Sequence, residues 1–294
     1  MRYPVYIVSK GRADTPLTAR CFERDGVDYK IAVEPQEADA YRKALGNHRV
    51  LVLPFSNLGV GSYPARQHVW DVSRREGHKR HWVFDDNIMQ FRRLHKGKRI
   101  PVNAGRAISI LEEFIDRYTN VAIGGFNYTM FAYTHSTSPY RVNAHLYSAM
   151  CIRNDLNAEW RMKYNEDVDL CLQVLTQGLC TVQFNAFCVD KISTLAGMKG
   201  GNQTELYKNN DPRKAWIKTQ ALKNVWGEYV TVKHKFSRWH HEIAWNKHFK
   251  QPLIRRADLD WKAIAEKQHT FNLSEQKPIK HRSIRKFKEE YNGQ

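Results

Sequence analysis

The feature that most constrains the fold is a regular alternation of short β-rich runs with helical segments. Runs of apolar and β-branched residues occur at 5–9, 30–34, 49–54 and 81–86. The segments between them with helical composition and spacing are 15–25, 37–45 and 64–76. Strands and helices that alternate in this way build a parallel sheet covered by helices. The sequence therefore predicts an α/β protein with a Rossmann-like, mostly parallel sheet flanked by helices.

One of these runs, HWVFDDN at 81–87, ends in two adjacent carboxylates and an amide. Three residues of a type that is usually buried precede Asp85, which indicates a core strand whose carboxyl end emerges where ligands bind in open α/β sheets. Adjacent acids repel each other, and a divalent metal that carries a phosphate is the usual compensating group. We therefore expect a metal and phosphate site at Asp85 and Asp86.

A second acidic motif, NEDVDLCLQVLTQG, occupies residues 165–178. Its apolar positions fit one face of a helix that Asn165 would cap. Glu166, Asp167 and Asp169 then fall in the first turn, where the helix dipole alone favours acidic residues. Helix stability is enough to explain each of these acids taken alone. A catalytic role is favoured only because the chain also contains the acidic motif at Asp85 and Asp86.

Several residues in the first half could bind a phosphate or a ribose. Ser9, Lys10 and Arg12 belong to the first strand-to-helix turn, where phosphates often bind. Arg66 follows Pro64 at the expected start of a helix, where a cation costs stability unless an anion compensates it. Glu34 ends the second strand, where it could accept hydrogen bonds from a ribose or base, or simply cap the next turn.

Charge is unevenly distributed along the chain. The formal net charge is +17, and residues 196–294 contain 21 Lys and Arg against 10 Asp and Glu. Five of the eight tryptophans fall in the same region. Basic side chains interleaved with aromatic ones can neutralise phosphates and stack on bases. We expect a catalytic domain over 1–195 and a basic, mainly helical, DNA-binding region over 196–294, although an ordinary helical subdomain would also contain buried tryptophans.

Composition excludes several classes of protein. No stretch approaches the ~18 apolar residues of a membrane helix, and the apolar run near the start lacks the pattern of a secretory signal. We therefore expect a cytoplasmic protein that does not bind membranes. The five cysteines are odd in number and contain no CxxC pair, which argues against a disulfide framework or a zinc site and favours buried thiols.

Five segments in this order carry a family resemblance: VYIVSKGRADTP, IAVEPQEADAY, the run GVGSYPAR through HWVFDDNI, YNEDVDLCLQVLTQG, and STLAGMKGGN. Together they resemble the TET-associated glycosyltransferases, GT-A-type enzymes found largely in bacteriophages. The resemblance spans about residues 3–235. It implies transfer of a sugar from a UDP-sugar to the hydroxyl of 5-hydroxymethylcytosine, or a related pyrimidine, in phage DNA inside the infected bacterial cell. The modification would protect that DNA from host nucleases.

The resemblance also implies roles for the acidic residues. In GT-A enzymes a D-x-D motif holds Mn²⁺ or Mg²⁺ against the donor diphosphate, and the ion stabilises charge on the leaving group. Here Asn87 takes the third position, so Asp86 is the expected metal ligand, with Asp85 on the ribose or the metal. Asp167 is the candidate general base and Glu166 would position the acceptor. The sequence leaves open whether the enzyme inverts or retains configuration.

Further candidates come from the later part of the chain. By similarity to other GT-A enzymes, Asp190 or His234 could be a late metal ligand. Lys199 lies in a glycine-rich segment whose composition suits a loop that closes over the diphosphate. The side chains expected to contact DNA in the basic region are Lys235, Arg238, Trp239, Arg255 and Arg256.

Two alternatives remain compatible with the sequence. A GT-A transferase that acts on a glycan would share the same donor site. A non-catalytic DNA-binding protein could keep a degenerate transferase fold, although the intact acids Asp85, Asp86, Glu166 and Asp167 count against it.

Overall fold

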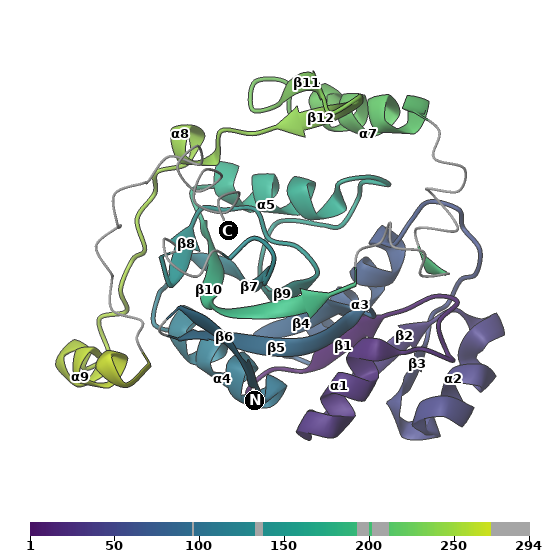
Figure 1. Cartoon of the computed structure of the whole chain (residues 1–294), viewed down its shortest axis with the longest axis horizontal. Helices are drawn as coiled ribbons and strands as arrows, with labels where there is room; N and C mark the ends of the chain where they lie inside the picture. Colours follow the sequence, from purple (N-terminus) through teal and green to yellow (C-terminus); the bar gives the residue numbers. More distant parts are fainter. Residues whose placement is uncertain (96, 133–137, 193–199, 202–211, 272–294) are drawn as a thin grey trace, which may run out of the picture.

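The structure is a computed structural model that describes residues 1–95, 97–132, 138–192, 200–201 and 212–271 (Figure 1). Its first part alternates strands and helices as predicted. The elements are β1 (Val5–Val8), α1 (Leu17–Asp25), β2 (Lys30–Val33), the 3-10 turn Pro35–Glu37, α2 (Ala38–Leu45), the 3-10 turn Asn47–Arg49, β3 (Val50–Val52), α3 (Tyr63–Arg75) and β4 (Arg80–Asp85). Each predicted strand and helix of this part is present, with ends that shift by a few residues.

The second part completes the sheet. Its elements are β5 (Ile88–His95), β6 (Lys98–Val102), α4 (Ala104–Ile115), β7 (Val121–Tyr128), β8 (Tyr140–Val142), β9 (Ala149–Arg153), α5 (Glu166–Thr176) and β10 (Cys180–Lys191). The sequence did not predict the β5–β6 hairpin. Most residues of these two strands are partly or fully exposed and many are cationic, so the apolar alternation that marks a half-buried strand is missing.

One mixed sheet organises this part, in the order β3-β2-β1-β4-β9-β7-β10-β5-β6, with β8 paired to β10. Strands β5, β8 and β9 run antiparallel to the strands beside them, and the others share one direction. This arrangement confirms the predicted α/β class with a mostly parallel sheet. Strand order reverses between β1 and β4, and such a switch point opens a crevice at the carboxyl ends of the strands.

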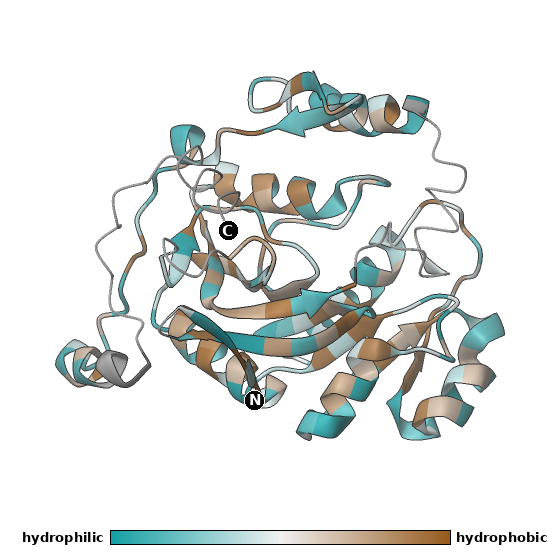
Figure 2. Ribbon diagram, in the orientation of Figure 1, coloured by the Kyte–Doolittle hydropathy of each residue, from teal (hydrophilic) through white to brown (hydrophobic). Residues whose placement is uncertain are grey.

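Each face of the sheet has its own hydrophobic core. Trp82 and Phe84 point to the face covered by α1, α2 and α4, whereas Val83 points to the face covered by α3 and α5. All three side chains are fully buried, because alternate residues of a central strand face opposite layers. Figure 2 shows the hydrophobic residues gathered in the central strands and on α5. The five cysteines are buried free thiols, as predicted.

The basic region contains α7 (Pro212–Val225), β11 (Thr231–Lys235), β12 (Arg238–Glu242), α8 (Trp245–His248) and α9 (Trp261–Phe271). The predicted helices are accompanied by the unpredicted hairpin β11–β12. The region packs on the sheet domain: the Asn165 side-chain amide donates to the carbonyl of Lys218 at 3.0 Å, and the Trp226 indole donates to Asp169 at 2.7 Å. The predicted domain boundary at 195/196 lies outside the described residues.

Every helix within the described ranges is too short or too polar to cross a bilayer.

Candidate active site

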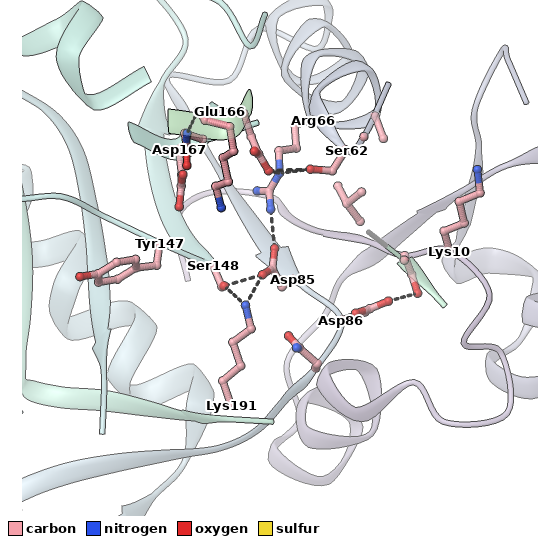
Figure 3. A pocket seen from close by; sticks show the side chains of 18 of the residues that line it. Lys10, Ser62, Arg66, Asp85, Asp86, Tyr147, Ser148, Glu166, Asp167 and Lys191 are labelled. Atoms are coloured by element: carbon pink, nitrogen blue, oxygen red, sulfur yellow. Dashed lines mark hydrogen bonds and ion pairs between the residues drawn. The ribbon is translucent and has the colours of Figure 1, made fainter. Parts of the chain in front are cut away.

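A cavity of about 1030 Å³ opens at the switch point of the sheet. Its walls come from the carboxyl ends of β1, β4 and β10, the first turns of α3 and α5, and the hairpin strand β12. Figure 3 labels ten of the residues that line the cavity, with Asp85 between Arg66, Ser148 and Lys191. The predicted residues that line the cavity are Ser9, Lys10, Arg12, Glu34, Arg66, Asp85, Asp86, Glu166, Asp167, Arg238 and Trp239.

Asp85, the last residue of β4, is surrounded by protein donors. Arg66 donates to its Oδ1. Lys191 Nζ donates to Oδ2 at 2.6 Å, and the hydroxyl of Ser148 donates to the same oxygen (Figure 3). Burial alone would raise the pKa of Asp85, but Lys191 and Arg66 hold it well below its usual range. Asp85 is therefore an anion clamped between two cations.

Asp86 points away from Asp85, toward the first strand-to-helix turn. Its Oδ2 accepts a hydrogen bond from Ser9 at 2.6 Å, and its Oδ1 forms an ion pair with Arg12. Only 4% of Asp86 is exposed. The tyrosine hydroxyl of Tyr41 lies 2.6 Å from Ser9 and accepts from the Arg12 backbone at 3.0 Å, which fixes the turn. Asp86 thus holds the turn that the sequence assigned to phosphate binding.

The same turn is tied to Glu34 and to a glycine pair. Lys10 Nζ lies 2.9 Å from Glu34, whose other oxygen accepts from the Asn57 backbone at 3.0 Å. Gly201 donates its N–H to the Lys10 carbonyl at 2.9 Å. A Cβ on Gly200 would lie 2.6 Å from the Gly11 carbonyl oxygen, and φ at Gly200 is +84°, so only glycine fits this close approach. This corner of the cavity is rigidly built.

Arg66 is the cation that the sequence placed at a helix start. It lies in the first turn of α3, is 6% exposed, and packs over the ring of Trp160 with 5.0 Å between the guanidinium carbon and the ring centroid. Asp85 supplies the compensating anion, with Glu166 at 3.8 Å. Among the described residues no group accepts a hydrogen bond from Nη1 of Arg66. The guanidinium therefore keeps one buried donor for a further anion.

Glu166 and Asp167 begin α5, and Glu166 lies beside Ser62 and Arg66 (Figure 3). Glu166 accepts from Ser62 at 2.8 Å, and burial followed by the nearby Asp167 charge raises its pKa. Asp167 lies 3.2 Å from His145 Nε2, and although burial opposes it, His145 holds the pKa of Asp167 below its usual range. Asp167 is the more exposed of the two, at 29% of its side chain against 14%. Asp167 is thus the more accessible of the two acids.

The hairpin and neighbouring aromatic residues form the other end of the cavity. Trp239 packs against Trp216 with ring centroids 4.6 Å apart. Tyr147 contacts His145, and His145 stacks on Trp245 at 5.8 Å between centroids. Burial and the charge of Asp167 raise the pKa of Tyr147 to about 12. Flat aromatic surfaces near Asp167 can stack on a planar ring.

Other predicted residues lie elsewhere. His234 does not line the cavity, and its ring packs on Trp239. Asp190 pairs with Arg92. Lys235 pairs with Glu242 on the hairpin. Lys199 lies outside the described residues.

Arg255 and Arg256 also lie away from the cavity, near α9. Arg255 packs over Trp261, and Arg256 pairs with Asp258 at 2.5 Å. Their predicted contact with DNA would need a second surface.

The side chains at the base of the cavity do not fit the metal site expected from the sequence. Both carboxylate oxygens of Asp85 and both of Asp86 already accept hydrogen bonds from cations or hydroxyl groups. Within the described ranges no three His, Cys, Asp or Glu side chains come together as a metal-binding group. His234, the candidate late metal ligand, lies on the hairpin strand β11 and outside the cavity that Asp85 and Asp86 line.

Sequence reasoning missed Lys191, Ser148, Tyr128 and His145. Lys191 is the last residue of the long strand β10, and His145 and Ser148 lie in the segment just before β9. In the sequence, only the polar ending DK of the alternating run CTVQFNAFCVDK at 180–191 points to Lys191. No spacing along the sequence relates these residues to Asp85, because the sheet order alone brings their strands together.

Comparison with known proteins identifies the family of the chain. No curated protein gives a significant match. One solved structure, a protein assigned as a nucleotide-diphospho-sugar transferase from Desulfovibrio desulfuricans G20, is 10% identical, covers 62% of this chain and 79% of its own, and has a TM-score of 0.34. The family model for TET-associated glycosyltransferases matches residues 3–201, which contain the strands and acidic residues at the base of the cavity. The chain therefore belongs to the TET-associated glycosyltransferase family.

Proposed function

We propose that the protein transfers a sugar from a UDP-sugar to the hydroxyl of 5-hydroxymethylcytosine, or a related hypermodified pyrimidine, in phage DNA in the infected bacterial cell. Family membership makes the chain a glycosyltransferase. One observation carries the acceptor proposal: a single cavity is lined by three features. These are the cations around Asp85 at its floor, the partly exposed carboxylate of Asp167, and the positively charged hairpin β11–β12.

The base of the cavity suits the nucleotide diphosphate of a donor. Lys10, Arg12, Arg66 and Lys191 surround it, and a diphosphate is the anion that such a cluster attracts. Glu34 lies at the end of β2, where a carboxylate can accept hydrogen bonds from a ribose. The donor nucleotide would therefore lie across β1 and β4.

Asp167 is our candidate for the general base. In the proposed reaction the acceptor hydroxyl gives its proton to Asp167 while its oxygen bonds to the anomeric carbon of the sugar. The bond between that carbon and the diphosphate oxygen breaks, and UDP leaves with the bonding pair. His145, with its Nε2 3.2 Å from Asp167, stabilises the carboxylate, and Glu166 orients the acceptor.

The hairpin β11–β12 supports a nucleic-acid acceptor. Lys233, Lys235 and Arg238 lie on its two strands, and Arg238 and Trp239 also line the cavity. Phe236 occupies the turn with φ of 50° and is 91% exposed. An apolar side chain at the tip of a basic ribbon can enter a base stack while the cations bind phosphates. A base displaced from the stack could then reach Asp167.

The test is to incubate the purified protein with a panel of UDP-sugars and DNA that contains either 5-hydroxymethylcytosine or cytosine. The DNA is digested to nucleosides and their masses are measured. Each reaction is run with Mn²⁺ and with chelator, so that the metal requirement predicted from the sequence is tested too. Asp167→Asn serves as the inactive control.

A mass gain of one sugar on the hydroxymethylated DNA alone would support the proposal. Transfer to a glycan but not to any DNA would refute the acceptor while leaving the transferase. DNA binding without donor hydrolysis or transfer would favour a non-catalytic role.

A further inference from the structure

We infer that Lys191 and Arg66 take the place of a divalent metal, so that the donor diphosphate binds to this chain without a metal ion. The inference rests on the proposed nucleotide-sugar donor and assigns the site that holds its diphosphate. It does not depend on which acceptor receives the sugar.

Lys191 is built into the base of the cavity. It ends β10, where the pairing with β5 shifts register between Asp190 and Lys191. A bulge of this kind re-aims the side chain that follows it. The ammonium lies 2.6 Å from Asp85 Oδ2 and 3.2 Å from the Tyr128 hydroxyl, and 13% of the side chain is exposed. Lys191 is therefore held in place while its ammonium still borders the cavity.

Arg66 holds the other oxygen of Asp85. Its Nε is engaged by Ser62 at 3.2 Å, its Nη2 by Asp85, and its Nη1 has no acceptor among the described residues. A buried donor without an acceptor is costly, and a phosphate oxygen would satisfy it. Trp160 beneath the guanidinium keeps its plane fixed.

The charges at this point select an anion over a cation. Arg66 and Lys191 share the carboxylate of Asp85, and the only other acid paired with Arg66 among the described residues is Glu166, 3.8 Å from it, whose pKa is raised by burial. A divalent metal brought to Asp85 would meet repulsion from both cations, and these already occupy the oxygens that it would bind. A diphosphate is attracted to the same cluster.

The same pair can stabilise the leaving group. When the bond between the anomeric carbon and the diphosphate oxygen breaks, negative charge grows on the terminal phosphate of UDP. Fixed cations that lie beside this phosphate oppose the charge without reorganisation. In this chain Lys191 and Arg66 supply those cations.

The first experiment is calorimetric titration of the full-length protein with UDP and with uridine, in excess EDTA and in Mn²⁺. We expect UDP to bind in EDTA with an affinity within about twofold of that in Mn²⁺. Because a fixed positive charge beside the diphosphate is lost, Lys191→Met should weaken UDP binding by about tenfold to a hundredfold and leave uridine binding nearly unchanged. Lys191→Arg should recover most of the loss, and Lys43→Met, on exposed α2, is the matched control.

UDP binding that disappears in EDTA and returns with Mn²⁺ would overturn the inference. So would a Lys191→Met variant that binds UDP as the wild type does. Metal-independent UDP binding combined with failure to modify any DNA would support the inference and refute the proposed acceptor. Because Lys191→Met could unfold the cavity base, Asp85→Asn/Lys191→Met provides a charge-balanced second variant, which should also bind UDP weakly.

Discussion

Asp85 forms ion pairs with both Arg66 and Lys191, an arrangement called here the charge clamp, and this predicts the sign of a change in thermal stability. Asp85→Asn removes the anion that both Arg66 and Lys191 share, and leaves two largely buried cations without their partner. Breaking a buried ion pair in this way costs about 3–5 kcal/mol. For a domain of this size, each kcal/mol lowers the melting temperature by roughly 2–4 °C, so we expect Tm to fall by about 6–20 °C.

If Asp85 is instead a metal ligand without a compensating cation, Asp85→Asn should change Tm in the opposite direction. An acid repelled by its neighbour Asp86 would destabilise the metal-free protein, and Asp85→Asn would raise Tm. Thermal unfolding in EDTA at pH 7 separates the two cases. Asp39→Asn removes an acid whose side chain is 97% exposed in its pair with Arg42, and should change stability by less than about 1 kcal/mol. An unchanged or raised Tm for Asp85→Asn would refute the clamp.

The ion pairs of Asp85 with Arg66 and Lys191 also predict how the stability loss of Asp85→Asn depends on pH. The folded state lowers the pKa of Asp85, so the pair contributes its stability above the unfolded pKa of about 3.9 and loses it as the pH falls through the lower folded value. The Tm difference between wild type and Asp85→Asn should therefore be constant between about pH 5 and pH 8, and should shrink in more acidic buffer. A difference that grows on acidification would contradict this assignment.

Three further variants test the rest of the cavity. Asp167→Asn should lower turnover by about 10²–10⁴-fold in the sugar-transfer assay with little change in UDP affinity, because it removes the proton acceptor and leaves the donor site intact; full turnover would exclude Asp167 as the base. Glu166→Gln should raise Tm, and more at pH 8 than at pH 5, because the folded state raises the pKa of Glu166 and so penalises its ionised form; unfolding scans at the two pH values check the sign. Phe236→Ala should reduce transfer to duplex DNA more than to single-stranded DNA, since only the duplex has to be opened, and an equal loss on both substrates would exclude a wedge.

Much of the fold could be predicted because local patterns and burial agree in the first 191 residues. The run at 81–86 is apolar on both sides because β4 lies in the middle of the sheet between two helical layers. The hairpins β5–β6 and β11–β12 were missed for the converse reason. Their residues are mostly exposed or half-buried, so no apolar period marks them.

The sequence by itself determined which acids face the cavity: Asp85 and Asp86 must emerge where a buried strand ends, and Glu166 and Asp167 where a helix begins. Only the tertiary structure decided what those acids do there. Lys191 approaches Asp85 from β10, which lies far from β4 along the chain, and Arg66 approaches it from α3, the helix that precedes β4. An aspartate binds a metal or neutralises a cation according to the charges that surround it, and those charges are brought together by the order of strands in the sheet.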